Sequence, residues 1–134
     1  MEAGFLRHVR NCNNAELPGA RLPFRIGKAQ VGWVKPDLAA KLQDFPEIST
    51  GPDGVTLADA TVLPAIARQL SDAGCYRWRR EEFDIRAGPD GPVLARLDRG
   101  ALPSFGVLAM GVHVNGLVRR PEGLHMWVAR RAAN

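Results

Sequence analysis

Apolar residues near the start of the chain recur at helical spacing. Phe5, Val9 and Cys12 share one face and basic residues lie between them, which predicts a short amphipathic helix over residues 5–14. After a loop marked by prolines, residues 24–34 are rich in apolar and β-branched side chains and contain two glycines. This second pattern predicts one or two short strands.

Two further helices are predicted in the first half of the chain. Pro36 begins the first, because the first turn leaves its backbone nitrogen without a partner in any case, and Pro46 ends it. The second spans about 61–73, and Gly74 caps its C-terminus. Apolar side chains on the buried faces of these two helices are Leu38, Leu42, Phe45, Leu63, Ile66 and Leu70.

Alternation with a period of two dominates the second half of the chain. Residues 83–87 and 93–97 alternate on either side of a Gly-Pro-Asp-Gly turn, which predicts a β-hairpin. A similar turn at residues 51–54 precedes a short strand at 55–57. A second hairpin is predicted from two further strands, 107–118 and 124–130.

The order of these elements predicts an α+β fold. It contains a small antiparallel sheet with two or three short helices, followed by a terminal β-hairpin. Pro103 and Ser104 mark the expected boundary. We therefore expect an N-terminal α+β domain over residues 1–103 and a hairpin that belongs to a second unit over residues 104–134.

Composition places the chain among folded globular proteins, since 46% of its 134 residues are hydrophobic and 24% are charged. No apolar stretch approaches the roughly 18 residues of a membrane span, and charges interrupt any signal-peptide pattern. Cys12 and Cys75 lie far apart and have no neighbouring metal-ligand pattern. We therefore expect a cytoplasmic protein with reduced thiols and no membrane partner.

The net positive charge of the chain favours an anionic partner. Eighteen Lys and Arg against fourteen Asp and Glu leave a formal charge of +4. Most arginines alternate with acids, but residues 101–134 carry four arginines, at positions 119, 120, 130 and 131, and one acid, Glu122. This distribution favours a local phosphate-facing cluster over a nucleic-acid groove, so a nucleic-acid partner is not expected.

Catalytic and metal-binding patterns are not evident in the chain. Residues 80–82, Arg-Glu-Glu, lie in a strand-like context and lack the series of glutamates on one helix face that holds a divalent cation against a diphosphate. His8, His113 and His125 have no second ligand at metal-binding spacing. We therefore predict no catalytic residue and no metal ligand in this chain.

Four segments carry a family resemblance that spans nearly the whole chain. They are FLRHVRNCNNA, LPFRIGKAQVGWVKPDLA, YRWRREEFDIR and GVHVNGLVRRPEGLHMWVARRAAN. Together they resemble the domain of unknown function that precedes the catalytic domain in Nudix hydrolases related to thiamine pyrophosphokinase-linked proteins. The last segment is the most specific, because VHVNGLV followed by LHMWVARR resembles the first hairpin of the Nudix domain.

The resemblance implies the N-terminal, accessory and substrate-proximal portion of a Nudix-type diphosphate hydrolase. The family enzyme uses Mg or Mn to cleave a diphosphate-containing small molecule, possible substrates being thiamine diphosphate or its damaged derivatives. Its metal-binding glutamates follow the point where this sequence ends, so activity from this chain alone is not expected. Substrate contact is implied for Arg25, Gln30 and Trp33 in the accessory motif and for Asn115, Arg130 and Arg131 in the hairpin.

A second interpretation assigns the chain a different function. It is then a free-standing interaction module whose basic tail binds a protein or a nucleotide. A Nudix hairpin without the rest of its sheet presents unpaired backbone groups and apolar side chains to water. The terminal hairpin therefore either packs on the accessory domain or pairs with a second copy in a homo-oligomer.

Overall fold

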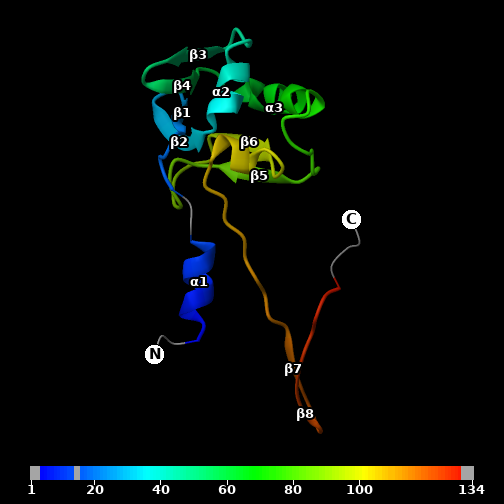
Figure 1. Cartoon of the computed structure of the whole chain (residues 1–134). Helices are drawn as coiled ribbons and strands as arrows, with labels where there is room; N and C mark the ends of the chain where they lie inside the picture. The colour runs from blue at the N-terminus through cyan, green and yellow to red at the C-terminus, as the bar shows by residue number, and fades with distance from the viewer. Residues whose placement is uncertain (1–3, 14–15, 131–134) are drawn as a thin grey trace.

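The computed structural model describes residues 4–13 and 16–130 of the chain. Most of its secondary structure gathers in one body, while α1 and the hairpin β7–β8 extend from it (Figure 1). In chain order the elements are α1 (Leu6–Cys12), β1 (Leu22–Ile26), β2 (Ala29–Val34), α2 (Pro36–Leu42), β3 (Ile48–Gly51), β4 (Gly54–Leu57), the 3-10 helix η1 (Ala60–Val62), α3 (Leu63–Asp72), β5 (Glu82–Ile85), β6 (Ala95–Asp98), α4 (Leu102–Phe105), β7 (Leu117–Arg120) and β8 (Gly123–Met126).

A four-stranded sheet in the order β2-β1-β4-β3 forms the centre of this body. The two hairpins, β1–β2 and β3–β4, are antiparallel, while β1 and β4 run parallel and join the hairpins into one sheet. A bulge between Phe24 and Arg25 shifts the β1–β2 register. The predicted α+β class is confirmed, with one parallel pair inside an otherwise antiparallel sheet.

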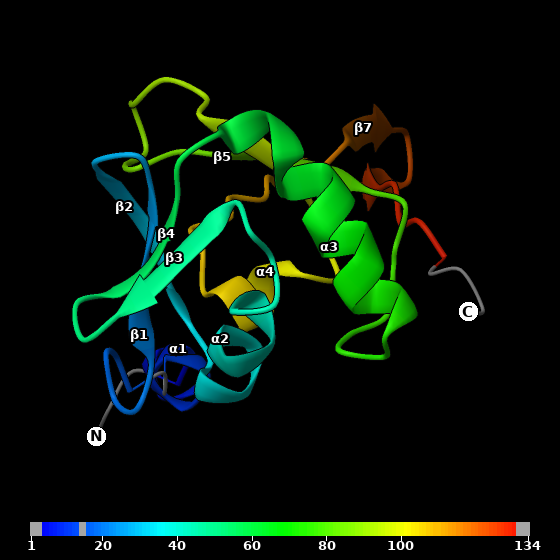
Figure 2. The same cartoon turned by 90° about the horizontal axis from the view of Figure 1, so that it is seen from above.

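Helices α2 and α3 lie on the same side of this sheet and close the core (Figure 2). The predicted inward positions Leu38 and Leu42 in α2 are buried, as are those of α3. Phe45, predicted on the same face, follows the end of α2 at Leu42 and is only partly buried against the core. Phe24 of β1 meets Phe105 of α4 with ring centroids 5.1 Å apart, an arrangement typical of aromatic pairs in cores. One hydrophobic core therefore includes residues from β1 through α4.

The second sheet is the predicted hairpin β5–β6, in which Glu82 pairs with Asp98 and Ile85 with Ala95. Buried Ile85 and Leu97 join it to the core. After β6 the chain turns into α4, which lies against β2 because Gly32 has no side chain. A Cβ at this glycine would come within 2.6 Å of the Phe105 carbonyl oxygen. Gly32 therefore allows the close approach of α4 and the following segment to the edge strand β2.

Three elements differ from the sequence-based predictions. Strand β3 was not expected, because its residues 49–51 are exposed and polar and show no apolar alternation. Helix α4 was not expected either, since Pro103 suggests a boundary, yet Leu102 and Phe105 are both buried in the core. The division after residue 103 stays a prediction, and the core continues through Phe105.

The third difference is the length of the terminal strands. Of the predicted strand 107–118, only residues 117 and 118 lie in a strand, as the start of β7, apart from one bridge between Val107 and Gly32. The predicted strand 124–130 likewise ends at Met126, with β8. Val112 and Val114 are 90% and 88% exposed, because no strand of the described residues lies beside them. The predicted hairpin itself is present, with Leu117 opposite Met126.

Candidate functional site

An open groove of about 1200 Å³ runs along the outer edge of β2. Gln30, Val31 and Trp33 contribute from β2, and Phe83 from β5 faces the same space. Segment 106–111, which follows α4, forms another wall. Aromatic and aliphatic walls with a few polar groups are typical of sites for small organic ligands.

Arg21 holds this groove together at one end. Its Nη1 donates hydrogen bonds to the carbonyl oxygen of Trp33 at 3.0 Å and to that of Pro103 at 2.9 Å. These two acceptors belong to β2 and α4, which are far apart in sequence. The Arg21 guanidinium therefore links the two sides of the groove through its Nη1 atom.

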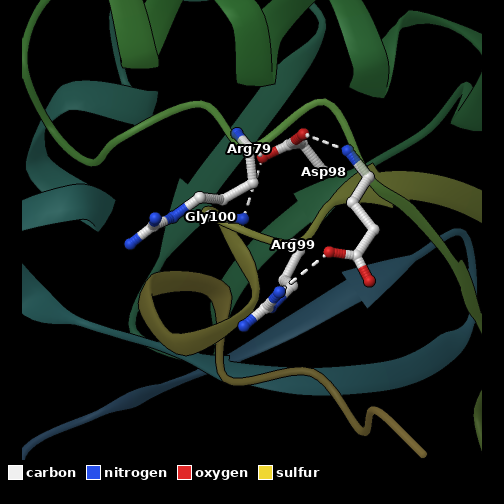
Figure 3. Close-up of polar contacts among 5 residues, drawn as sticks. Arg79, Asp98, Arg99 and Gly100 are labelled. Atoms are coloured by element: carbon white, nitrogen blue, oxygen red, sulfur yellow. Dashed lines mark hydrogen bonds and ion pairs between the residues drawn. The ribbon is translucent and has the colours of Figure 1, made fainter. Parts of the chain in front are cut away.

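Asp98 anchors the loop that leads into β5 (Figure 3). Its side chain is only 2% exposed, and its carboxylate accepts hydrogen bonds from the backbone N–H groups of Arg79 at 2.9 Å, Glu81 at 3.1 Å and Gly100 at 2.8 Å. Burial alone raises the pKa of Asp98, but these backbone donors, together with that of Arg80, outweigh burial and lower the pKa below its ordinary value. Asp98 is therefore a charged structural anchor.

Arg99 and Glu81 form an ion pair at the rim of the groove. The Arg99 Nη1 lies 2.9 Å from Glu81 Oε2, and both side chains are about half exposed. The hydrogen bond to Glu81, helped by the negative charge of that residue, raises the pKa of Arg99. This pair adds a polar edge to the groove, which Arg99 lines.

The structure brings Gln30 and Trp33 of the predicted contact residues together in the groove. The Gln30 side chain makes no hydrogen bond within the described residues and remains available to a ligand. Arg25 is not among the residues that line the groove. Its Nη1 donates to the Asp53 carbonyl oxygen at 2.6 Å, which ties β1 to the turn between β3 and β4.

The predicted contact residues of the hairpin segment lie elsewhere. Asn115 and Arg130 are exposed on the projecting segment and are not part of the groove wall. Arg131 lies outside the described residues. The described contact residues therefore lie in three places: Gln30 and Trp33 in the groove, Arg25 at the turn between β3 and β4, and Asn115 and Arg130 on the projecting segment.

Arg21, Asp98 and Arg99 were missed by the sequence analysis. The sequence offers one indication of the role of Asp98, since Asp-Arg-Gly after an alternating strand is typical of a turn whose aspartate accepts backbone hydrogen bonds. No sequence pattern indicates the role of Arg21, because it donates to carbonyl groups of residues far away in the chain. Both positions become apparent only when the tertiary contacts are known.

Within the described residues, no three His, Cys, Asp or Glu side chains gather closely enough to bind a metal ion. His125 lies 3.5 Å from Glu122 across the turn of the terminal hairpin. In residues 4–13 and 16–130, no helix combines the length and apolar character that a bilayer span requires.

Comparison with known proteins shows similarity along almost the whole chain. The family described as "Domain of unknown function (DUF4743)" matches residues 4–109. Nudix hydrolase 24, chloroplastic, from Arabidopsis thaliana is 28% identical over 145 aligned residues, which cover 96% of this chain and 39% of that protein. Nudix hydrolase 20, chloroplastic, from the same plant is 28% identical over 153 residues, covering 96% of this chain and 40% of that protein. The chain thus spans about two fifths of the length of these relatives.

Proposed function

Because the chain belongs to the family of DUF4743 domains, and its two plant relatives are Nudix hydrolases, we propose that it is the accessory, substrate-proximal portion of a Nudix-type diphosphate hydrolase. One observation carries this proposal. The similarity to both hydrolases covers 96% of the chain, whereas the domain family ends at residue 109. The similarity therefore extends beyond the accessory domain into the segment that carries β7 and β8.

The terminal hairpin supports the same proposal on physical grounds. An isolated two-stranded hairpin is marginally stable in water and needs further strands or a packed face. Leu117, Leu124 and Met126 share one face, and all three are exposed. Trp127 is 74% exposed beyond the end of β8. We therefore assign residues 104–134 to the beginning of the hydrolase domain, whose remaining strands would cover these side chains.

The substrate class follows from the proposed enzyme. It is a small molecule that contains a diphosphate, and thiamine diphosphate and its damaged derivatives are the specific candidates. The groove along β2 offers Trp33 and Phe83 as an apolar wall and the Gln30 amide as a hydrogen-bonding group. These features suit a heteroaromatic ring, and Arg25, Asn115, Arg130 and Arg131 remain proposed contacts.

The divalent cation of the enzyme, Mg or Mn, would be held outside the described part of this chain. Three or more carboxylate, His or Cys ligands do not gather anywhere in the described residues, so these residues do not fit such a site. The proposed contribution of this chain is therefore contact with the substrate. We propose the cytoplasm as its location, which suits two free cysteines.

Steady-state hydrolysis by the chain extended through the hydrolase domain tests the role of the groove. Gln30→Ala is expected to raise the KM for the diphosphate substrate about tenfold while kcat changes less, because it removes a hydrogen bond that also exists in the ground state. Gln43→Ala, at an exposed glutamine of α2's C-terminal end, is the matched control. Equal effects of both substitutions would exclude substrate contact by the groove.

A further inference from the structure

The loop between α3 and β5 presents a concentration of unpaired positive charge. Its residues 77–80 are Arg-Trp-Arg-Arg, and the side chains of Arg77, Arg79 and Arg80 are exposed. None of the three guanidinium groups has a hydrogen bond or ion pair within the part of the chain that the structure describes. Neighbouring arginines do have acidic partners: Arg68 with Asp72, Arg86 with Asp84, Arg96 with Asp84 and Glu82, and Arg99 with Glu81.

The backbone of this loop is held in place by the buried residue Asp98. Buried Asp98 accepts hydrogen bonds from the N–H groups of Arg79 and Glu81, and Figure 3 shows the Arg79 side chain extending away from that carboxylate. Arg80 has a φ of 60°, a left-handed conformation that is uncommon for residues other than glycine. Gly100 completes the support, since a Cβ there would collide with the carbonyl oxygen of Arg77.

Trp78 anchors the loop to α3. The guanidinium carbon of Arg68 lies 5.2 Å from the centre of its ring, and the tryptophan is half-buried against the core. The three loop arginines therefore project from a backbone that is held on both sides. Binding an anion would not require the backbone to become ordered, which is a large part of the cost for a mobile loop.

We propose that loop 77–80 binds the phosphate groups of the organic diphosphate on which the full enzyme acts, an inference that rests on the proposed function. Arginine suits this role, because its planar fork donates two parallel hydrogen bonds to phosphate oxygens. A compact anion is favoured over an extended nucleic acid. Glu81, Glu82 and Asp84, which follow the loop, are paired with Arg99, Arg96 and Arg86, so the unpaired positive charge here is confined to the three loop arginines and suits a short anion.

The groove along β2 does not include residues 77–80. A phosphate bound at the loop therefore lies on the surface of this domain, where the hydrolase domain would supply the remaining contacts. The diphosphate is therefore assigned to loop 77–80, the arginine loop, which is a different surface of the accessory domain from the β2 groove.

Inorganic pyrophosphate is the probe for the 134-residue chain, with binding followed by NMR through backbone amide shifts. Shifts confined to residues 77–81 are expected. The triple variant Arg77→Gln, Arg79→Gln, Arg80→Gln should weaken binding about tenfold or more, because each guanidinium contributes charge-assisted hydrogen bonds. The control triple Lys28→Gln, Lys41→Gln, Arg120→Gln removes the same formal charge at exposed positions outside the loop and its neighbouring strands and should leave the affinity within about twofold.

Equal weakening by both triple variants, or an absence of shifts at the loop in the millimolar range, would overturn the proposal. So would a single-stranded RNA that binds the loop and is not displaced by pyrophosphate. If the loop triple variant does not fold, Arg79→Lys replaces it in the test. Lysine keeps the positive charge but lacks the planar guanidinium fork, so pyrophosphate should still bind more weakly than to the wild-type chain. In the extended enzyme, an unchanged KM for the organic diphosphate in the loop triple variant would defeat this inference and leave the proposed function intact. If the loop binds pyrophosphate but the extended enzyme hydrolyses no organic diphosphate, the proposed function fails and the anion site remains.

Discussion

The carboxylate of Asp98 lies 2.9 Å from the backbone nitrogen of Arg79, a residue 19 positions earlier in the chain. This hydrogen bond joins the end of β6 to the arginine loop, and two more backbone donors, from Glu81 and Gly100, complete the carboxylate's environment. A carboxylate that accepts several backbone hydrogen bonds in a buried position fixes the path of the chain around it. The loop therefore depends on Asp98 for its conformation.

Asp98→Asn is expected to lower the free energy of unfolding by about 2 kcal/mol, because the amide nitrogen cannot accept a hydrogen bond and faces backbone donors. Urea denaturation at neutral pH measures this loss. Asp84→Asn, at an exposed strand position, should change stability by less than about 0.5 kcal/mol. Equal losses in the two variants would show that Asp98 is not the anchor of the loop.

The pH dependence of stability should differ between the wild-type chain and Asp98→Asn. Folding lowers the pKa of Asp98, so the wild-type advantage is fully present above the unfolded pKa of about 3.9 and is lost as pH falls through the lower folded pKa. The difference in unfolding free energy between the two proteins should therefore shrink below about pH 4. A difference that stays constant or grows on acidification would contradict the lowered pKa.

Arg80→Gly tests the left-handed backbone of the loop. Glycine adopts a φ of 60° without steric cost, which offsets its greater freedom in the unfolded chain, so stability should stay the same or rise by up to about 1 kcal/mol. Arg79→Gly, next to it but without a positive φ, should cost about 0.5–1 kcal/mol. Thermal unfolding compares them, and a larger loss at Arg80 would contradict the observed conformation.

Gly32→Ala tests the contact between β2 and α4. The added Cβ would lie 2.6 Å from the Phe105 carbonyl oxygen, so the two segments must separate, at a cost of about 1–3 kcal/mol. Gly51→Ala is the control, because a Cβ there has no heavy atom within 4 Å. Denaturant midpoints of the two variants give the comparison. A neutral Gly32→Ala would mean that the close approach is absent in solution.

The exposed face of the terminal hairpin should cause the isolated chain to self-associate. Size-exclusion chromatography with light scattering is expected to show association that disappears when Leu117, Leu124 and Met126 are all replaced by Lys, since these three exposed apolar side chains lie on one face of the hairpin. Lys at exposed Gln43, Thr50 and Gln69 provides a matched change of charge. A wild-type chain that stays monomeric at all concentrations would contradict this prediction.

Helix positions and the two major hairpin patterns could be predicted from the sequence, because local signals determine them. Pro36 places the start of α2, and the spacing of Leu63, Ile66 and Leu70 identifies the buried face of α3. Helix α4 could not be predicted, because Leu-Pro-Ser-Phe carries a boundary signal and its burial depends on the space that Gly32 leaves beside β2.

The candidate sites were predicted less completely. The family motif pointed to Gln30 and Trp33 as contact residues, and both line the groove along β2, where their contact with substrate stays a prediction. The anchor Asp98 and the unpaired state of Arg77, Arg79 and Arg80 were not predicted. Pairing depends on which acids β5 and β6 bring beside each arginine, and strand register is a tertiary property.

Hydrolysis of thiamine diphosphate with magnesium, measured as released phosphate, tests the central claim most directly. The claim predicts no turnover above background by the 134-residue chain and clear turnover by the same chain extended through the hydrolase domain, with activity reduced when residues 4–109 are deleted from the extended protein. Turnover at an enzymatic rate by the 134-residue chain alone, or full activity after the deletion, would contradict an accessory, substrate-proximal role.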